Sequence, residues 1–253
     1  MSAIPAIVDR AAWMEQVAEL RKREKAHTRE GDTIAAARRR LPMVEVDAST
    51  PLVGASGVVT LLDAFEGRSQ LFASYHMWHT GRAAAEQCEG CTFNSGQVLE
   101  LGYLHSRDVT FAVFCQGPFA ESSRYREFMD WEMPWYSVPT ESVDRLVAGR
   151  HFGMKCCYLR DGDRVFETYW TTARGCEAMG GSYGMLDMTV YGRQETWEDS
   201  PDGWPQRFGT AGGQFRLNGR PTSQWSRIAA GRSDDLGTAP TADSEHSHNK
   251  PAR

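Results

Sequence analysis

Two nearly continuous apolar runs, residues 70–77 and 109–115, constrain the fold of this chain more than any other feature. Apolar runs of this length without alternation are typical of strands that are covered on both faces of a sheet. Parallel strands of this kind need a long connection, and the segment between the two runs has room for a helix. The sequence therefore predicts a strand–helix–strand unit with a right-handed crossover at the centre of an α/β sheet.

Further elements extend this unit towards the C-terminus. Residues 119–131 have the apolar spacing of an amphipathic helix, and residues 133–138 indicate a third, short strand. Residues 161–163, Asp-Gly-Asp, stand between two extended runs and predict a β-hairpin. Residues 175–188 have a helical pattern. The predicted order is therefore β, α, β, α, β, a hairpin and a helix.

The N-terminal region, residues 1–42, is predicted to form a helical arm. Apolar residues recur at i, i+4 and i+7 from Trp13, and Asp9 is placed to cap the first helix. Residues 30–32, Glu-Gly-Asp, are expected to break the arm into two helices.

Three further regions follow the arm. Residues 43–197 form the predicted α/β domain, and residues 198–228 form an irregular C-terminal extension. Residues 229–253 contain too few apolar residues to offset the entropy of ordering, so this tail is predicted to be disordered. The extension is expected to be pinned by its aromatic residues Trp204, Phe208, Phe215 and Trp225.

Composition narrows the classes of partner. A net charge of −5 in 253 residues argues against a protein that mainly binds nucleic acid or an anionic membrane. The chain has no apolar run of about 18 residues and no basic-then-apolar start, so we expect a cytoplasmic protein. Six cysteines in a reducing compartment are too few for a disulfide scaffold. A close pair of cysteines there implies catalysis or a metal site.

Such a pair is present in Cys88-Glu89-Gly90-Cys91, at the expected start of a helix. Unpaired backbone N–H groups and the positive end of the helix dipole lower the pKa of a thiol at this position. We expect Cys88 to be the attacking thiolate and Cys91 the thiol that resolves the mixed disulfide. Gly90 permits close approach of a substrate backbone, whereas the carboxylate of Glu89 disfavours a thiolate.

Two histidines upstream leave a second interpretation open. His76 and His79 lie where the first apolar strand ends, and either is a candidate base or metal ligand. Together with Cys88 and Cys91 they provide the four ligands of a zinc or copper site. The simpler alternative is that His76 packs inside the strand with one hydrogen bond.

The remaining cysteines are weaker candidates. Cys115 ends a buried strand and is expected to be a small core residue. Cys156 and Cys157 are adjacent on a strand, so their side chains point to opposite faces. Cys176 lies near a predicted helix start and is expected to be an accessory thiol with a lowered pKa.

Several separated motifs occur in one order along the chain: Leu41-Pro42, Gly67-Arg68-Ser69-Gln70-Leu71, Tyr75-His76-Met77, Cys88-Glu89-Gly90-Cys91, Arg107-Asp108-Val109-Thr110-Phe111, Met133-Pro134-Trp135, Arg160-Asp161-Gly162 and Gly192-Arg193. In these motifs the chain resembles domain-of-unknown-function family number 899, bacterial proteins similar to thioredoxins and peroxiredoxins. The resemblance covers about residues 13–197. It implies a thioredoxin-like three-layer α/β sandwich with a central mixed sheet.

The cysteine pair and this resemblance together favour a cytoplasmic thiol–disulfide oxidoreductase without a cofactor, acting on a protein or small-molecule thiol or disulfide. The expected catalytic residues are Cys88 and Cys91. Two alternatives stay open: a zinc- or copper-binding protein, and a non-enzymatic module that binds a protein through an aromatic cleft. The expected binding residues are His76, Trp78, His79, Gly90 and Trp135.

Two positions differ from ordinary thioredoxins. Gln87 precedes the first cysteine where thioredoxins have tryptophan, and Phe152-Gly153-Met154 stands where thioredoxins have a proline that lies against the dithiol.

Overall fold

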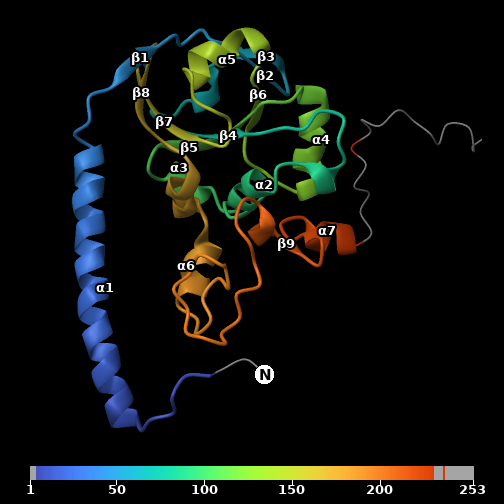
Figure 1. Ribbon diagram of the computed structural model, residues 1–253. Helices are drawn as coiled ribbons and strands as arrows, with labels where there is room; N and C mark the ends of the chain where they lie inside the picture. The colour runs from blue at the N-terminus through green and yellow to red at the C-terminus, as the bar shows by residue number, and fades with distance from the viewer. Residues whose placement is uncertain (1–3, 231–235, 237–253) are drawn as a thin grey trace, which may run out of the picture.

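The computed structural model describes residues 4–230 and Leu236, and its strands form one large mixed sheet and one small ribbon (Figure 1). Among these residues the large sheet has eight strands in the order β1-β8-β7-β4-β5-β6-β2-β3. Its strands are β1 (Val44–Val46), β2 (Pro51–Gly54), β3 (Gly57–Thr60), β4 (Gln70–His76), β5 (Val109–Cys115), β6 (Trp135–Ser137), β7 (Lys155–Asp161) and β8 (Arg164–Thr171). The ribbon pairs β9 (Arg216–Leu217) with β10 (Arg220–Pro221).

Most helices connect these strands, whereas α1 precedes the first strand of the large sheet and α6 and α7 follow its last one. The α-helices are α1 (Arg10–Arg38), α2 (Glu89–Gly96), α3 (Gly102–His105), α4 (Phe119–Met129), α5 (Thr140–Val147), α6 (Gly181–Asp187) and α7 (Trp225–Ala229). Short 3-10 helices are η1 (Asp63–Phe65), η2 (Ala84–Glu86), η3 (Ala173–Met179) and η4 (Gly213–Phe215).

The centre of the sheet is the unit that the two apolar runs predict. β4 and β5 pair in parallel over their full length, from Gln70 opposite Val109 to His76 opposite Cys115. β6 continues the parallel part beside β5, whereas β7 is antiparallel to β4 and forms a hairpin with β8. This mixed sheet with crossover helices is a thioredoxin-like fold, as predicted.

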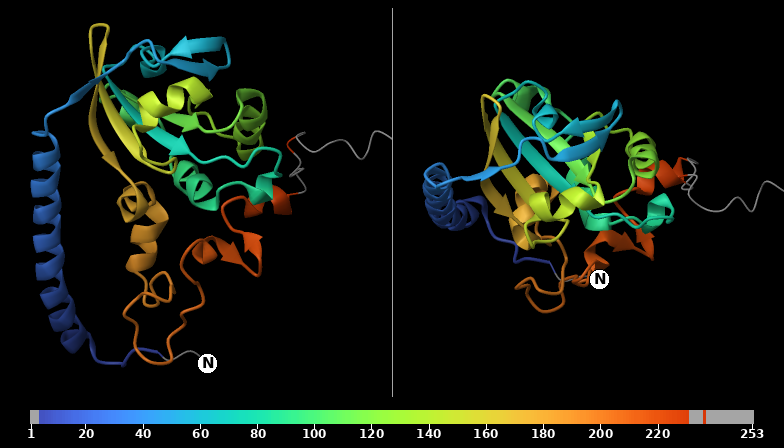
Figure 2. Two further views of the ribbon diagram at one scale, coloured as in Figure 1. Left: turned by 45° about the horizontal axis from the view of Figure 1, so that its top comes forward. Right: turned by 90° about the horizontal axis from the view of Figure 1, so that it is seen from above.

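Helices lie on both faces of the central strands and create three layers (Figure 2), with apolar side chains packed on each face. On one face Leu71 and Tyr75 belong to a buried cluster that includes Leu146 of α5. On the other face Phe111 belongs to a second cluster that includes Tyr125 of α4. Burial on both faces explains why β4 and β5 read as continuous apolar runs rather than alternating ones.

Helix α1 corrects one expectation for the N-terminal arm. Asp9 caps the helix as predicted, accepting a hydrogen bond from the backbone N–H of Ala12 at 2.9 Å. The helix then runs unbroken through residues 30–32 as far as Arg38, and none of its residues is buried. It stands beside the domain rather than against it (Figures 1 and 2). The expected break is wrong because one glycine costs a helix only about 1 kcal/mol.

The chain after the hairpin only partly follows the sequence pattern. The expected helix over residues 175–188 is two pieces, η3 and α6, and the extension contains the ribbon β9–β10 and α7. Of the predicted disordered tail, Ala229 and Ala230 are described with Leu236, whose side chain is buried in the second core cluster and so departs from that prediction. The rest of the tail lies outside the described residues.

Candidate active site

The two cysteines of the predicted dithiol lie at the start of α2, just beyond the carboxyl end of β4. Cys88 is the N-cap residue of this helix, and Cys91 sits in its first turn. Cys88 is half-buried, whereas Cys91 is 4% exposed. One thiol is therefore reachable from solvent and the other lies directly behind it.

The surroundings of Cys88 stabilise its thiolate. The Cys91 thiol hydrogen-bonds to its sulfur, and the backbone N–H groups of Cys91 and Gly90 add to this effect. These bonds outweigh the opposing effect of burial and lower the pKa of Cys88 to about 7. About half of this thiol is ionised at neutral pH, far more than of a free cysteine, whose pKa is about 8.5.

Cys91 has the opposite character. Its bond to Cys88 and its burial raise its pKa well above the ordinary value of a thiol. The site thus favours the thiolate form of the first cysteine and the thiol form of the second.

A buried lysine, which sequence reasoning missed, lies beneath the dithiol. Lys155 at the start of β7 is 1% exposed, and its ammonium group donates a hydrogen bond to Ser74 Oγ at 2.8 Å. Burial lowers the pKa of Lys155, whereas the charges of Cys91 and Cys88 raise it. Its own charge lowers the pKa of both thiols of the pair.

Gln87, which replaces the tryptophan of thioredoxins, holds the loop that leads to Cys88. Its buried amide group accepts a hydrogen bond from the backbone N–H of His79 at 3.0 Å. It donates to the carbonyl oxygens of His79 and Arg82 at 3.0 and 2.9 Å. These three bonds fix the backbone on the N-terminal side of the dithiol.

A chain of hydroxyl groups ties the same cysteine to the C-terminal extension. The Thr92 hydroxyl donates to the carbonyl oxygen of Cys88 at 2.8 Å and lies 2.7 Å from the hydroxyl of Tyr125. The amide of Gln224, which is fully buried, donates to that same tyrosine oxygen at 2.8 Å. Gln224 is a further site residue that the sequence did not single out.

A cavity of about 420 Å³ opens beside the two thiols. Gly153 with its positive φ of 98° lies on its wall, in the position where thioredoxins have proline. The polar side chains around the cavity are Asn94, Thr172, Arg174, Glu177 and Gln214, and the aromatic ones are Phe152, Tyr183 and Phe215.

The predicted binding residues divide between two places. Gly90 lines the cavity beside the dithiol, and His79 lines a neighbouring cavity that Cys88 also borders. His76, Trp78 and Trp135 line neither of these cavities but lie in the second face of the sheet, where all three are buried.

His76 is enclosed by aromatic rings. Its ring centroid lies 5.3 Å from that of Trp135 and 6.1 to 6.4 Å from those of Tyr125, Trp78 and Trp131. Within the described part of the chain, neither of its ring nitrogens has a hydrogen-bond partner. The expected single hydrogen bond is therefore wrong. Burial, with the nearby charges of Lys155 and His79, lowers the pKa of His76 to about 3, so the ring is neutral.

The geometry offers no support for the zinc or copper interpretation. Over residues 4–230 and at Leu236, no group of three or more His, Cys, Asp or Glu side chains is placed to hold a metal ion. The two thiols share a cavity, His79 lines a neighbouring cavity that Cys88 also borders, and His76 lines neither of them.

The other cysteines follow their predicted places with one exception. Cys115 and Cys156 are fully buried in opposite core clusters, and Cys157 points to the other face from Cys156. Cys176 lines the dithiol cavity, but burial raises its pKa rather than lowering it. The expected lowering is wrong because burial disfavours the charged thiolate more than the charge of Lys155 favours it.

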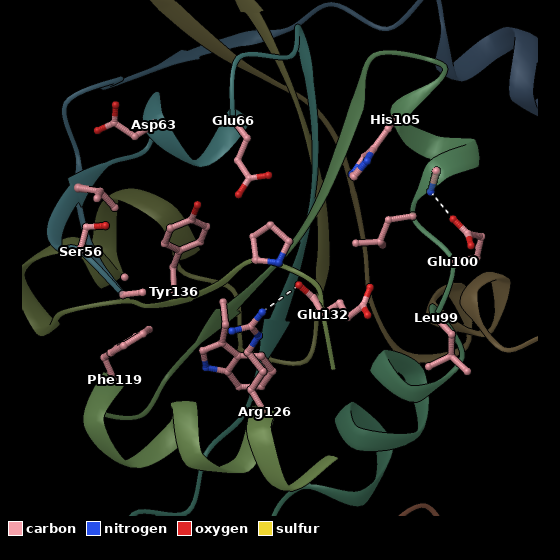
Figure 3. Close-up of a pocket in the computed structure, with 17 residues that line it drawn as sticks. Ser56, Asp63, Glu66, Leu99, Glu100, His105, Phe119, Arg126, Glu132 and Tyr136 are labelled. Atoms are coloured by element: carbon pink, nitrogen blue, oxygen red, sulfur yellow. Dashed lines mark hydrogen bonds between the residues drawn. The ribbon is translucent and has the colours of Figure 1, made fainter. Parts of the chain in front are cut away.

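A larger cavity of about 770 Å³ lies away from the dithiol, among segments that precede β5 and β6 (Figure 3). Glu66, Glu100 and Glu132 approach it from different elements, and Arg126 donates to the carbonyl oxygen of Glu132 at 2.9 Å. Since no thiol lines it, this cavity is separate from the dithiol chemistry.

Fold and site together define a thioredoxin-like protein with an asymmetric pair of thiols at the start of a helix. The family model of bacterial proteins of unknown function DUF899 matches residues 2–211, so the chain belongs to that family. A comparison with curated proteins finds no significant match. No helix in the described ranges combines the length and the apolar character needed to cross a membrane.

Solved structures with which the chain aligns have low identity. A Chlorobium tepidum protein assigned as the thiol:disulfide interchange protein DsbE is 17% identical, with a TM-score of 0.37 over 55% of this chain and 94% of that one. Peroxidoxin BcpB from Mycobacterium tuberculosis is 14% identical, with a TM-score of 0.36 over the same shares. A thioredoxin-like protein from Aeropyrum pernix is 13% identical, with a TM-score of 0.35 over 62% and 99%.

Proposed function

We propose that this protein is a cytoplasmic thiol–disulfide oxidoreductase in which Cys88 attacks the substrate and Cys91 resolves the intermediate. The observation that carries the proposal is the opposite effect of the site on its two thiols. The pKa of the half-buried thiol, Cys88, falls to about 7, and that of the buried thiol, Cys91, rises. Thiol–disulfide exchange by a dithiol needs one thiolate that attacks the substrate and one thiol that stays protonated until it resolves the mixed disulfide. The opposite pKa shifts of Cys88 and Cys91 suit these two roles.

The reaction then takes two exchange steps. The Cys88 thiolate attacks one sulfur of a substrate disulfide, forms a mixed disulfide with it and releases the other sulfur as a thiolate. Cys91 gives up its proton and attacks the sulfur of Cys88, which expels the second substrate thiolate. Two protein thiols become one disulfide, the substrate disulfide becomes two thiols after protonation, and a thiol reductant reverses the change.

Alkylation of the reduced protein with iodoacetamide at a series of pH values tests the first role. We expect Cys88 to react fastest of the cysteines, with a rate that rises with pH through about 7 and is constant above pH 8.5. Mass spectrometry of the digested protein assigns the modified residue. A midpoint at 8.5 or higher, or faster reaction at another cysteine, would contradict the proposed nucleophile.

The second role is tested by mild oxidation. One equivalent of a disulfide oxidant should link Cys88 to Cys91 in a single peptide, and the Cys91→Ser variant should instead retain the oxidant on Cys88. Cys157→Ser is the matched control, since Cys157 lies outside the dithiol cavity.

Elemental analysis of protein prepared without a histidine tag distinguishes the metal-binding alternative from the proposed redox function. Stoichiometric zinc or copper, lost in a Cys88→Ser, Cys91→Ser double variant, would favour that alternative.

A further inference from the structure

The C-terminal extension covers one side of the dithiol, including the glycine between the two cysteines. A Cβ atom built on Gly90 would lie 3.3 Å from Cε2 of Phe215, so the two residues are in contact. The ring of Phe215 also lies 5.6 Å from that of Phe93 in α2. Part of the surface around Gly90, on which a substrate backbone was expected to lie, is therefore covered by a side chain of the same protein.

Ionic and polar bonds fix this extension to the helix that carries the cysteines and to the neighbouring elements η2 and α4. The guanidinium group of Arg216 pairs with Glu89, Nε to Oε1 at 2.6 Å. The buried amide of Gln224 donates to the carbonyl oxygen of Ala84 at 3.1 Å as well as to the hydroxyl of Tyr125. Because buried polar bonds of this kind are costly to break, the extension is a fixed wall of the site.

The ion pair also weakens the effect that the negative charge of Glu89 would have on the thiolate of Cys88. The carboxylate of Glu89, next to the nucleophile, was expected to disfavour the thiolate. Its negative charge is offset by Arg216, and its side chain is held towards the extension.

Two cavities of small-molecule size border Cys88, the one beside both thiols and a neighbouring one of about 640 Å³. The volume of the first, about 420 Å³, falls within the range of about 300–1,000 Å³ that is usual for small ligands. A folded protein docks instead through a surface of about 800 Å² on each partner. Phe215, which contacts Gly90, takes up part of the surface beside the dithiol that such a partner would need.

Charged groups at the cavity favour a substrate with ionic and amide groups. Arg174 is bonded to Glu177, Nε to Oε1 at 3.0 Å, and lies over the ring of Trp197 with its Cζ 4.4 Å from the centroid. These contacts orient the guanidinium group at the rim while its side chain stays 68% exposed. Asn94 and Gln214 add amide groups able to bind a peptide unit.

We infer that the site acts on low-molecular-weight disulfides of short, carboxylate-bearing peptides and excludes disulfides of folded proteins. Arg174 would bind the carboxylate, and Phe215 would keep larger substrates away from Cys88. This inference rests on the proposed function. The exchange steps are those given above, with the peptide disulfide reduced to two thiols as Cys88 and Cys91 become oxidised.

The inference is tested by measuring the rate constants with which three disulfides oxidise the fully reduced, full-length protein. The probes are oxidised glutathione, neutral hydroxyethyl disulfide and insulin, and each rate constant is divided by that of dithiothreitol with the same probe. We expect the normalised constant to be at least tenfold greater for oxidised glutathione than for insulin. A constant for insulin that equals or exceeds the one for oxidised glutathione would overturn the inference and leave the proposed function intact.

Two variants locate the cause. Phe215→Ala should reduce the preference for oxidised glutathione over insulin at least fivefold, whereas Phe208→Ala, an aromatic of the same extension that does not line the cavity, should keep the parental preference. Arg174→Gln should slow the reaction with oxidised glutathione several-fold and leave that with neutral hydroxyethyl disulfide as in the parent. An unchanged preference in both variants would contradict the assigned roles. Failure of every disulfide to oxidise Cys88 would overturn the proposed function as well.

Discussion

At the scale of single residues, a buried charge adds to the hydrogen bonds that stabilise the thiolate of Cys88. A neighbouring cation affects a thiolate more when both are shielded from water, because the field between them is weakly screened. Lys155 is such a cation beneath Cys88 and Cys91, and it is among the most deeply buried large side chains of the chain. Its ammonium group donates a hydrogen bond to Ser74 Oγ there.

Lys155→Met should therefore raise the pKa of Cys88, because the variant keeps much of the side-chain volume and loses the charge. We expect the midpoint of the iodoacetamide rate to move from about 7 towards the 8.5 of a free thiol. Lys25→Met, a change on the exposed face of α1, is the control for loss of a lysine. A midpoint that stays at 7 in Lys155→Met would show that the bonds to Cys91 and Gly90 act alone.

His76 should make the fold sensitive to acid. Its folded-state pKa of about 3 is below the 6.5 of an unfolded chain, so the unfolded state binds the proton first as the pH falls. The contribution of neutral His76 to the free energy of unfolding is fully present above pH 6.5. It is lost between pH 6.5 and 3, by up to about 1.4 kcal/mol per pH unit. His76→Leu should lose less stability over this range in urea unfolding, and His79→Leu, an exposed histidine, is the control. Parallel curves for His76→Leu and the parent would count against this account.

The sequence alone points to the two cysteines of the dithiol, but not to the buried residues around them, Lys155 and Gln224. The difference has a physical reason. Cys88 and Cys91 owe their placement to local features, a strand end and a helix start. Lys155 and Gln224 are 64 and 133 residues further along the chain than Cys91, and only the folded sheet and extension bring them to the site. In sequence the first reads as an ordinary strand residue and the second as a polar residue in an irregular segment.

At the scale of elements, the strands are predicted more accurately than the helices. The bounds of β5 equal the predicted 109–115, since a strand buried on both faces is apolar along its whole length. Helix α5, by contrast, was not predicted, although its Leu146 and Val147 are buried. Eight residues give too few turns for a clear apolar periodicity.

Helix α1 gives a test at this scale, because Gly31 lies in its interior with no atom within 4 Å of a Cβ built there. Gly31→Ala should stabilise the helix by about 1 kcal/mol without any clash. Amide hydrogen exchange within the helix should slow by about fivefold around this position. Faster exchange would show that the glycine relieves strain in the helix. The alkylation rate of Cys88 should match the parent's, which makes it the internal control.

At the scale of the whole molecule, the chain is a thioredoxin-like domain with one attached helix and one integrated extension. The extension bonds to the active-site helix through Arg216, and to Ala84 of η2 and Tyr125 of α4 through Gln224. Helix α1 has no buried residue, and one contact of its end with the domain places the guanidinium of Arg38 5.0 Å from the ring centroid of Tyr169. The two appendages, which look equally peripheral in sequence, therefore differ in their importance for the site.

Removal of residues 1–41 should accordingly leave a folded, reactive protein. Loss of one cation–π contact costs about 0.5–1 kcal/mol, which corresponds to a fall of about 2–4 °C in the melting temperature of a domain this size. The midpoint of Cys88 alkylation should stay at about 7, because α1 contributes nothing to the thiolate. A longer deletion, residues 1–47, also removes β1, which pairs with β8 through Val44, Glu45 and Val46, and it should lower the melting temperature further. A fall of more than about 10 °C on removal of residues 1–41 alone would mean that α1 is part of the folded domain, contrary to its exposure.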